Sequence, residues 1–268
     1  MADLARHDAW GAGESYDAYM GRWSRQVAPH FLDRLGTGSR LDWLDIACGT
    51  GALSGAILAR CEPRSVLGID ASAGFVARAR EALADPRAAF EVGDAGALPV
   101  ESGSRDAVVS ALAMNFVPDR GAALAEMRRV ARAGGRVGFY VWDYPGGGLE
   151  FVRLFWAAAV ALDPRAADLA EGRRFSFCEP DALSAMATAV GLGDVACAAI
   201  EAPTVFRDFG DFWRPFTLGA GPAPGYCASL APEALGRLRE SLRAGLLARE
   251  DGAIALKVRA WAVTATAD

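Results

Sequence analysis

Short apolar runs alternate with longer amphipathic segments between about Leu41 and Asp143. The runs have the aliphatic composition of strands that are covered on both faces, and the segments between them place apolar residues at helical spacing. This alternation predicts βαβ units and a parallel sheet. The predicted strands are 42–47, 65–70, 88–93, 106–111 and 136–143, and the predicted helices between them are 51–60, 72–84 and 118–131.

The pattern changes after Asp143, where the turn-rich loop 144–148 follows. The segment 205–218 is dense in Phe and Trp, and the prolines and glycines of 219–226 predict a break in regular structure. Leucines at 235, 238, 242 and 246 follow helical spacing and predict an amphipathic helix over 232–248. The other predicted elements are helices over 149–162 and 180–190, a strand at about 194–201 and a final strand over 256–266.

Charge, cysteine content and hydropathy limit the kinds of partner that we expect for this chain. The net charge of −5 argues against nucleic acid, which selects a basic surface. The five cysteines are scattered without C-x-x-C spacing, so we expect neither a disulfide framework nor a zinc site, and we predict no metal. The first residues do not resemble a signal peptide, and no apolar run reaches the roughly 18 residues of a membrane span. We therefore expect a cytoplasmic protein without a membrane partner.

The stretch most informative about chemistry is 44–51, where a strand ends in Asp45 and two glycines lead into a helix. Glycine allows a positive φ and a close approach of ligand, and the helix start points free N–H groups into the turn. A dinucleotide fingerprint, G-x-G-x-x-G, would need a third glycine where this chain has Ser54. Asp70 lies 19 residues beyond Gly51 and can accept from both ribose hydroxyls. The turn alone fits NAD as well as S-adenosylmethionine.

Further segments carry a family resemblance. The segment D-I-A-C-G-T-G at 45–51 resembles the first signature of class I S-adenosylmethionine-dependent methyltransferases, D-x-[GA]-x-G-x-G. Gly93-Asp94-Ala95 resembles the signature after the third strand, and 106–110 resembles the fourth strand. The segment 132–135 is similar to the turn before the fifth strand, with Ala133 where proline is usual. The ordered set covers about Leu41 to Asp143.

This resemblance implies a Rossmann-like α/β fold. The sheet would have seven strands in the order 3-2-1-4-5-7-6 with the last strand antiparallel, helices on both faces, and a helical and aromatic cap. It implies S-adenosylmethionine as the cofactor, with the glycine turn around its methionine part and Asp94 at the adenine amino group. The expected cofactor-binding residues are Asp45, Ala47, Cys48, Gly49, Gly51, Asp70, Ala71, Asp94, Ala95, Ala111, Leu112, Tyr16 and Arg22.

The head of the chain adds a second resemblance. The segment 16–24, Y-D-A-Y-M-G-R-W-S, is similar to the leader of a bacterial subgroup near the ubiquinone/menaquinone-biosynthesis type. It implies a helical leader at 1–40 that covers the site, followed by a methyltransferase domain at 41–268 with cap insertions at about 144–180 and 203–250. The alternative is that Tyr16, Tyr19 and Trp23 only pack a helix on the core.

The resulting hypothesis is an enzyme, monomeric or homodimeric, that moves a methyl group to a small-molecule acceptor by in-line displacement and releases S-adenosylhomocysteine. No catalytic residue is assigned, because His7 and His30 are the only histidines and Asn115 stands where the wider class often has histidine. Two alternatives stay open: an NAD-binding oxidoreductase and a non-catalytic binding module. The candidate substrate-pocket residues are Tyr19, Met20, Trp23, Asn115, Phe116, Asp143, Tyr144, Phe206 and Trp213.

Overall fold

A seven-stranded sheet organises the computed structural model, which describes residues 20–218 and 221–268. The strand order is β3-β2-β1-β4-β5-β7-β6, and β7 runs antiparallel to β5 while β3, β2, β1, β4 and β5 pair in parallel. The predicted fold and strand order are confirmed. The strands are β1 Asp42–Ile46, β2 Ser65–Asp70, β3 Ala88–Val92, β4 Arg105–Ala111, β5 Ala131–Trp142, β6 Leu192–Phe206 and β7 Ile254–Ala267.

The chain divides into two compact units. The sheet unit comprises 24–142, 177–200 and 260–268, and the helical unit comprises 143–176, 201–259 and, among the described residues, 20–23. Strands β6 and β7 contribute residues to both units. The leader at 1–40 and the insertions at 144–180 and 203–250 stay predictions.

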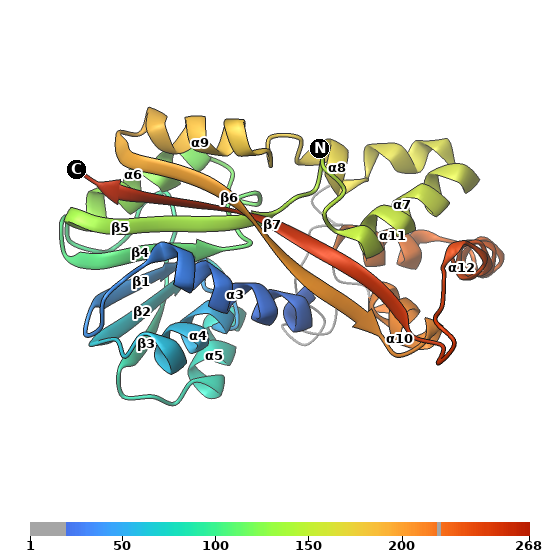
Figure 1. The fold of residues 1–268 in the computed structure, drawn as a ribbon, viewed down its shortest axis with the longest axis horizontal. Coiled ribbons are helices and arrows are strands. Elements are labelled where there is room, and N and C mark those ends of the chain that lie inside the picture. Colours follow the sequence, from blue (N-terminus) through green and yellow to red (C-terminus); the bar gives the residue numbers. More distant parts are fainter. Residues whose placement is uncertain (1–19, 219–220) are drawn as a thin grey trace. The chain divides into compact units, whose positions relative to one another are not determined.

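Helices cover both faces of the sheet in the sheet unit. Helices α3, α4 and α5 lie on one face, and α6 and α9 lie on the other (Figure 1). Their bounds are α3 Arg22–Leu35, α4 Ala52–Arg60, α5 Ala73–Ala82, α6 Arg120–Val130 and α9 Pro180–Ala189. The helical unit contains α7 Glu150–Leu162, η2 Pro164–Asp168, α8 Glu171–Arg174, α10 Phe209–Trp213, η3 Arg214–Thr217, α11 Pro222–Ser229 and α12 Pro232–Gly245. Strands β5 and β6 are longer than predicted.

The predicted break at 219–226 is wrong from Pro222 onwards, because α11 begins there. Pro222 and Pro224 lie in the first turn of the helix, where a backbone N–H has no partner inside the helix. The ring of proline also presets the φ that a helix needs. Gly221, with a φ of 94°, precedes the helix as its N-cap. The prolines and the glycine therefore mark a helix start.

Gly68 on β2 lies where the core of the sheet unit is tightly packed. A Cβ atom at this position would lie 2.4 Å from Cδ1 of Phe90 on the neighbouring strand and 2.9 Å from Sγ of Cys48. Cys48 and Phe90 form a buried hydrophobic cluster with Val76 and Ala79 of α5. Only glycine fits this position without movement of the cluster.

We expect Gly68→Ala to lower the free energy of unfolding by about 1–3 kcal/mol, because Phe90 must leave its rotamer to admit a methyl group. Urea denaturation measures the loss. Gly38→Ala is the matched control, since a Cβ at Gly38 meets no atom within 4 Å. Equal stability of the two variants would contradict the tight packing around Gly68.

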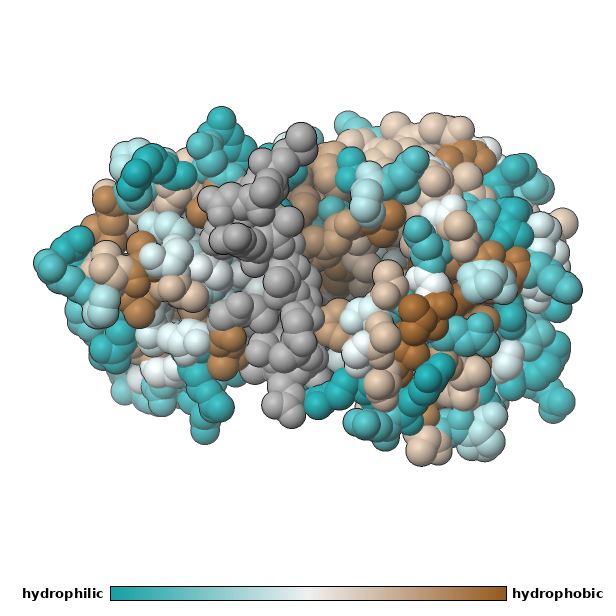
Figure 2. Space-filling view, turned by 180° about the vertical axis from the view of Figure 1, so that it is seen from behind, coloured by the Kyte–Doolittle hydropathy of each residue, from teal (hydrophilic) through white to brown (hydrophobic). Residues whose placement is uncertain are grey.

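The surface of the chain is mixed. On the face drawn in Figure 2, hydrophobic residues form patches among hydrophilic ones. Four large hydrophobic side chains are exposed among the described residues, namely Val92, Leu162, Val205 and Leu247. None of the helices within 20–218 and 221–268 combines the length and hydropathy that crossing a membrane requires.

Candidate functional site

Three of the predicted acids lie at one edge of the sheet. Strands β3, β2 and β1 are parallel neighbours, so their carboxyl ends meet at the same edge. Asp45 is the penultimate residue of β1, Asp70 is the last residue of β2, and Asp94 follows β3 by two residues. Open α/β sheets bind their ligands at this edge. The three acids therefore lie at or just after the carboxyl ends of three adjacent strands.

Asp70 joins three segments of this edge through hydrogen bonds. Its Oδ2 accepts from the backbone N–H of Gly49 at 2.9 Å, and its Oδ1 accepts from the N–H of Ser72 at 2.8 Å. Its carbonyl oxygen accepts from the N–H of Gly93 at 3.0 Å. A carboxylate offers about four acceptor positions, so two hydrogen bonds leave capacity for ligand hydroxyls. Asp70 thus organises the glycine turn and still has acceptor capacity for a ligand.

The turn after β1 adopts left-handed backbone conformations. Gly49 and Gly51 have φ values of 55° and 86°, and Ala47, which is not glycine, has a φ of 53°. Leu112, directly after β4, has a φ of 56°. Such conformations cost about 1–3 kcal/mol for residues other than glycine and cluster at functional sites. The two strained residues follow adjacent strands, at the edge that carries the acids.

The start of α4 can receive an anionic group. Gly51 is its N-cap and provides no side-chain cap. The backbone N–H groups of the first helical turn lack partners inside the helix, and the helix dipole favours negative charge there. A Cβ at Gly49 would meet no atom of the described residues within 4 Å, so these residues leave the backbone of the turn open to a ligand.

Asp45 is a fully buried acid with one partner. Its Oδ2 accepts from Oγ of Ser54 at 2.6 Å, whereas its Oδ1 has no partner among the described residues. Burial raises the pKa of its carboxyl group from 3.8 to about 7. Ser54 occupies the position of the third glycine in a dinucleotide fingerprint, and its hydroxyl donates a hydrogen bond to Asp45. Sequence reasoning noted the serine but missed this bond.

Cys48 contributes packing through its side chain. It is buried in the cluster with Val76, Ala79 and Phe90, and burial raises the pKa of its thiol. Its backbone N–H donates to the carbonyl of Ile69 at 3.1 Å. Because the thiol packs against α5, only the backbone of Cys48 is left for the predicted cofactor contact, which stays a prediction.

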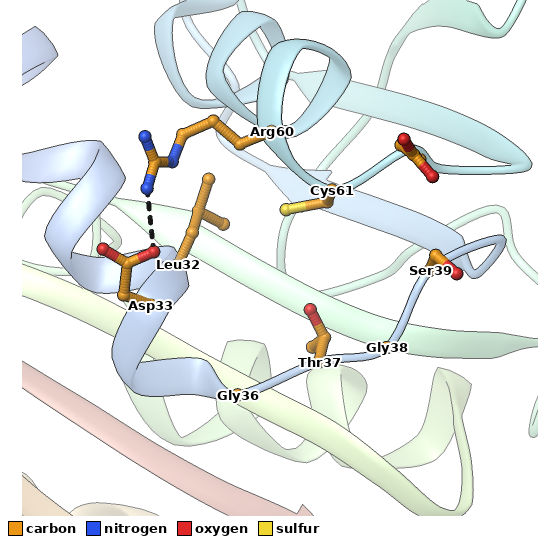
Figure 3. A pocket seen from close by; sticks show the side chains of 9 residues that line it. Leu32, Asp33, Gly36, Thr37, Gly38, Ser39, Arg60 and Cys61 are labelled. Atoms are coloured by element: carbon orange, nitrogen blue, oxygen red, sulfur yellow. Dashed lines mark hydrogen bonds and ion pairs between the residues drawn. The ribbon is translucent and has the colours of Figure 1, made fainter.

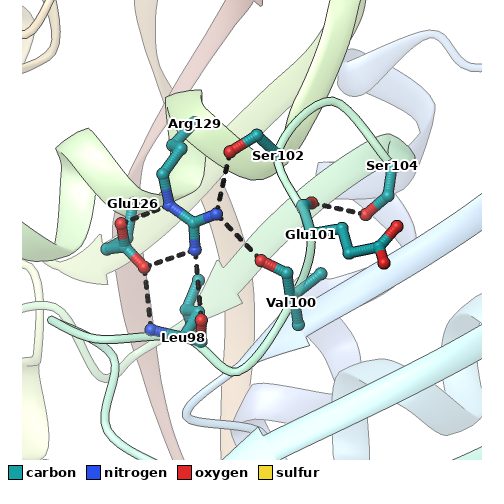
Figure 4. A network of polar contacts seen from close by, with 7 residues as sticks. All are labelled: Leu98, Val100, Glu101, Ser102, Ser104, Glu126 and Arg129. Carbon is teal, nitrogen blue, oxygen red and sulfur yellow. Dashed lines mark hydrogen bonds and ion pairs between the residues drawn. The ribbon is translucent and has the colours of Figure 1, made fainter.

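The loop after β3 is held by an ion pair on α6 (Figure 4). Glu126 Oε2 accepts from the N–H of Leu98 at 2.8 Å. Arg129 donates to the carbonyl oxygens of Leu98 and Val100, and it pairs with Glu126 at 2.5 Å. At the start of this loop, Asp94 Oδ1 accepts from the N–H of Gly96 at 2.8 Å. The network fixes the loop that begins with Asp94 and Ala95.

Asp143, a predicted pocket residue, stabilises a turn of the helical unit. Its Oδ2 accepts from Nε of Arg259 at 2.7 Å, and its Oδ1 accepts from the N–H of Gly146 at 2.9 Å. Its backbone N–H donates to the carbonyl of Arg259 at 3.0 Å. Asp143 is 1% exposed. These bonds hold the glycine-rich loop 144–148 in shape, and a substrate contact by Asp143 stays a prediction.

Arg22, a predicted cofactor residue, contacts the helical unit on several sides. Its guanidinium binds both carboxylate oxygens of Asp211, at 2.9 and 3.2 Å, and the carbonyl of Val205 at 3.1 Å. It also stacks on the rings of Trp23 and Phe206, at 4.0 and 4.8 Å from their centroids. A cofactor contact by Arg22 stays a prediction. Tyr16, Tyr19 and His7 lie outside the described residues.

The predicted aromatic pocket residues belong to a packed cluster in the helical unit. The Phe206 ring lies 5.2 Å from the Trp23 ring and 5.2 Å from the Phe212 ring. Phe206, Phe212 and Phe216 are at most 1% exposed, so they form the core of this unit. Trp213 stacks on Phe209, and Tyr144 packs on Phe175. Met20 is also buried. Direct contact of these side chains with a substrate stays a prediction.

A cavity of about 440 Å³ lies at the other edge of the sheet unit (Figure 3). It is lined by the loop 36–39 before β1 and by residues 60–62 before β2, at the amino ends of these strands. Asp33 and Arg60 form an ion pair of 2.9 Å beside it. The cavity is therefore separate from the edge that carries Asp45, Asp70 and Asp94.

Comparison with known proteins identifies related sequences. Residues 44–135 match a family described as "Methyltransferase domain". The demethylmenaquinone methyltransferase of Roseiflexus castenholzii is 31% identical over 161 residues, which cover 57% of this chain and 68% of that protein. The demethylmenaquinone methyltransferase of Beutenbergia cavernae is 42% identical over 106 residues, which cover 40% and 42% of the two chains. The chain spans less than half the length of several curated relatives that it matches.

Solved structures share the fold at low identity. Phosphoethanolamine N-methyltransferase 2 of Haemonchus contortus, in complex with S-adenosyl-L-methionine, has a TM-score of 0.60 and 17% identity. The match covers 96% of this chain and 57% of that chain. The [4+2]-cyclase SpnF has a TM-score of 0.54 and 16% identity over 90% of this chain and 80% of its own. The fold is therefore shared by proteins whose names describe different reactions.

Proposed function

Because the chain belongs to the class I S-adenosylmethionine-dependent methyltransferases, near the ubiquinone/menaquinone-biosynthesis type, we propose that it binds S-adenosylmethionine and moves the methyl group to a small-molecule acceptor. The observation that carries the proposal is the edge of the sheet unit where Asp45, Asp70 and Asp94 follow one another on adjacent strands. The strained turn after β1 lies at the same edge.

Each acid suits one part of the cofactor. Asp70 has acceptor capacity left for the ribose hydroxyls, and Asp94, held at the head of its loop, suits the adenine amino group. The open backbone at Gly49 and the start of α4 suit the methionine part. The Oδ1 atom of Asp45 is a buried acceptor that lacks a partner among the described residues, and a donor or a positive charge would satisfy it.

Methyl transfer depends on how precisely the enzyme positions the cofactor and the acceptor. When bound, the cofactor supplies an electrophilic methyl group on a sulfonium, and its transfer is an in-line displacement. Holding two reactants in line contributes up to about 7–11 kcal/mol to lowering a barrier. Asp70 and the Arg129–Glu126 pair serve this purpose, because they fix the turn and the loop that surround the cofactor edge. His30 lies exposed on α3 and is not assigned as a base.

The cellular setting belongs to the same proposal. All five cysteines are free thiols, as expected in a reducing compartment. The free thiols support a cytoplasmic enzyme, and the proposal includes that it acts as a monomer or a homodimer. A small-molecule acceptor is supported by the two relatives whose names give demethylmenaquinone as the substrate.

Thermal-shift titration tests the proposal. A ligand at a hundredfold excess over its Kd stabilises a protein by about 2.7 kcal/mol, which corresponds to a Tm increase of about 5 °C for a chain of this size. We expect this increase with S-adenosylhomocysteine and none with NAD. Stabilisation by NAD alone would support an oxidoreductase instead. Binding without transfer of labelled methyl to any of a broad acceptor panel would support a non-catalytic binding module.

A further inference from the structure

Asn115 has a buried side chain whose hydrogen-bonding groups are unused. It lies in the loop between β4 and α6 and is 4% exposed. Neither Nδ2 nor Oδ1 of its amide has a partner among the described residues. The surrounding backbone is paired, since the N–H of Phe116 donates to the carbonyl of Ala113 at 2.8 Å. Asn115 is also the only polar side chain in 112–117.

A structural role does not account for this amide. A buried polar group without a partner costs stability, and an apolar residue of similar size would avoid the cost. Asp143, another buried polar residue, has such a role through Arg259 and Gly146. The Asn115 amide holds none of the described residues in place through a hydrogen bond.

The position of Asn115 points to a ligand. Its loop begins at the carboxyl end of β4, beside β1, which is the edge where Asp45 lies. The first residue of the loop is Leu112, in a left-handed conformation, and its N–H is bonded to the carbonyl of Tyr140 at 2.8 Å. A strained loop start and an unused amide therefore occur together at the ligand-binding edge of the sheet.

We propose that the Asn115 amide positions the methyl acceptor by binding a neutral hydroxyl group of it, so that the acceptor class is a hydroxyl compound and not a carboxylate, a phosphate or an ammonium compound. This inference rests on the proposed function. The amide donates through Nδ2 and accepts through Oδ1, and a hydroxyl group can both accept and donate. A carboxylate or a phosphate would satisfy Nδ2 alone, and an ammonium group would satisfy Oδ1 alone.

The experiment compares three probes that share one ring system: 2-naphthol, 2-naphthoic acid and 2-naphthylmethylamine. Each is titrated into the complex of the full chain with S-adenosylhomocysteine by calorimetry. We expect 2-naphthol to bind best, and Asn115→Leu to weaken its binding at least about tenfold, which is the effect of losing the two hydrogen bonds between the amide and a neutral hydroxyl group. Met114→Leu is the matched control, because it changes a buried neighbour in the same loop without altering a polar group.

Two further measurements separate this role from a structural one. Asn115→Leu should keep or raise the Tm of the ligand-free chain, since it removes a buried amide without a partner, and should leave the affinity for S-adenosylhomocysteine within about twofold. A lowered Tm would mean a structural role, and weakened binding of S-adenosylhomocysteine would mean that the cofactor is the partner. Either result would overturn the inference. So would a wild-type complex that does not bind 2-naphthol, or an Asn115→Leu variant that binds it as well as the wild type does. Failure of the wild-type chain to bind S-adenosylhomocysteine would instead refute the proposed function.

Discussion

An Asp70→Ala variant is expected to lose on the order of a hundredfold or more in affinity for S-adenosylhomocysteine. Hydrogen bonds to a charged group contribute about 1.5–3 kcal/mol each, and the proposed ribose contact involves two of them. The substitution also removes the acceptors of the Gly49 and Ser72 N–H groups. The turn after β1 and the start of α5 would then lose their common anchor, which adds to the loss.

Isothermal titration calorimetry measures the effect, and thermal unfolding checks that the variant is folded. Asp85→Ala is the matched control, because it removes the same charge at the amino end of β3, where Asp85 pairs with Arg87 at 2.7 Å. Asp70→Asn covers the case of a misfolded alanine variant, since its amide keeps one acceptor oxygen. Unchanged affinity in a folded Asp70 variant would show that this carboxylate does not bind the ribose.

The second large effect is a pH dependence of stability that comes from Asp45. Burial raises the pKa of this carboxyl group to about 7, against 3.8 as its ordinary value. Between these values the folded chain holds a proton that the unfolded chain has released. The free energy of unfolding therefore falls as the pH rises through this range, by about 4 kcal/mol in all, and stays low above it.

Asp45→Asn removes this titration and keeps an acceptor oxygen for Ser54 Oγ. Relative to the wild type, the variant should gain about 4 kcal/mol of stability between about pH 4 and pH 8, measured by urea denaturation at several pH values. Asp85→Asn serves as the control, because Arg87 lowers the pKa of the partly exposed Asp85 to about 2, so that this carboxylate stays ionised across the range. A difference between Asp45→Asn and the wild type that does not change with pH would contradict a buried, protonated Asp45.

Local patterns were sufficient for most elements of the sheet unit. Strands β1 to β4 and helices α4 to α6 lie within about two residues of their predicted bounds, because apolar periodicity and glycine turns act over a few residues. The same local reasoning failed at Pro222 and Pro224, since proline interrupts a helix in its interior but suits its first turn. The order of the strands came from the family resemblance and not from the pattern.

The candidate site was predictable to a different extent. Asp45, Asp70 and Asp94 could be found because each lies at or just after the end of a strand, and the ends of parallel strands meet. Their partners could not be found in this way. Glu126 and Arg129 stand 28 to 31 residues away from the loop carbonyl and N–H of Leu98 that they hold, and Arg259 is 116 residues away from Asp143.

The sequence by itself therefore determined the parts of the proposed cofactor edge: the strands, the glycine turn and the acids that follow one another along the chain. Only the tertiary structure decided which side chains have a hydrogen-bond or packing partner and which have none among the described residues. It made Ser54 a hydrogen-bond donor to Asp45 and buried Phe206 in a hydrophobic core. It left both polar atoms of the Asn115 amide without a partner among the described residues. The physical reason is that periodicity is a local property, whereas burial and hydrogen bonding depend on segments that meet only when the chain folds.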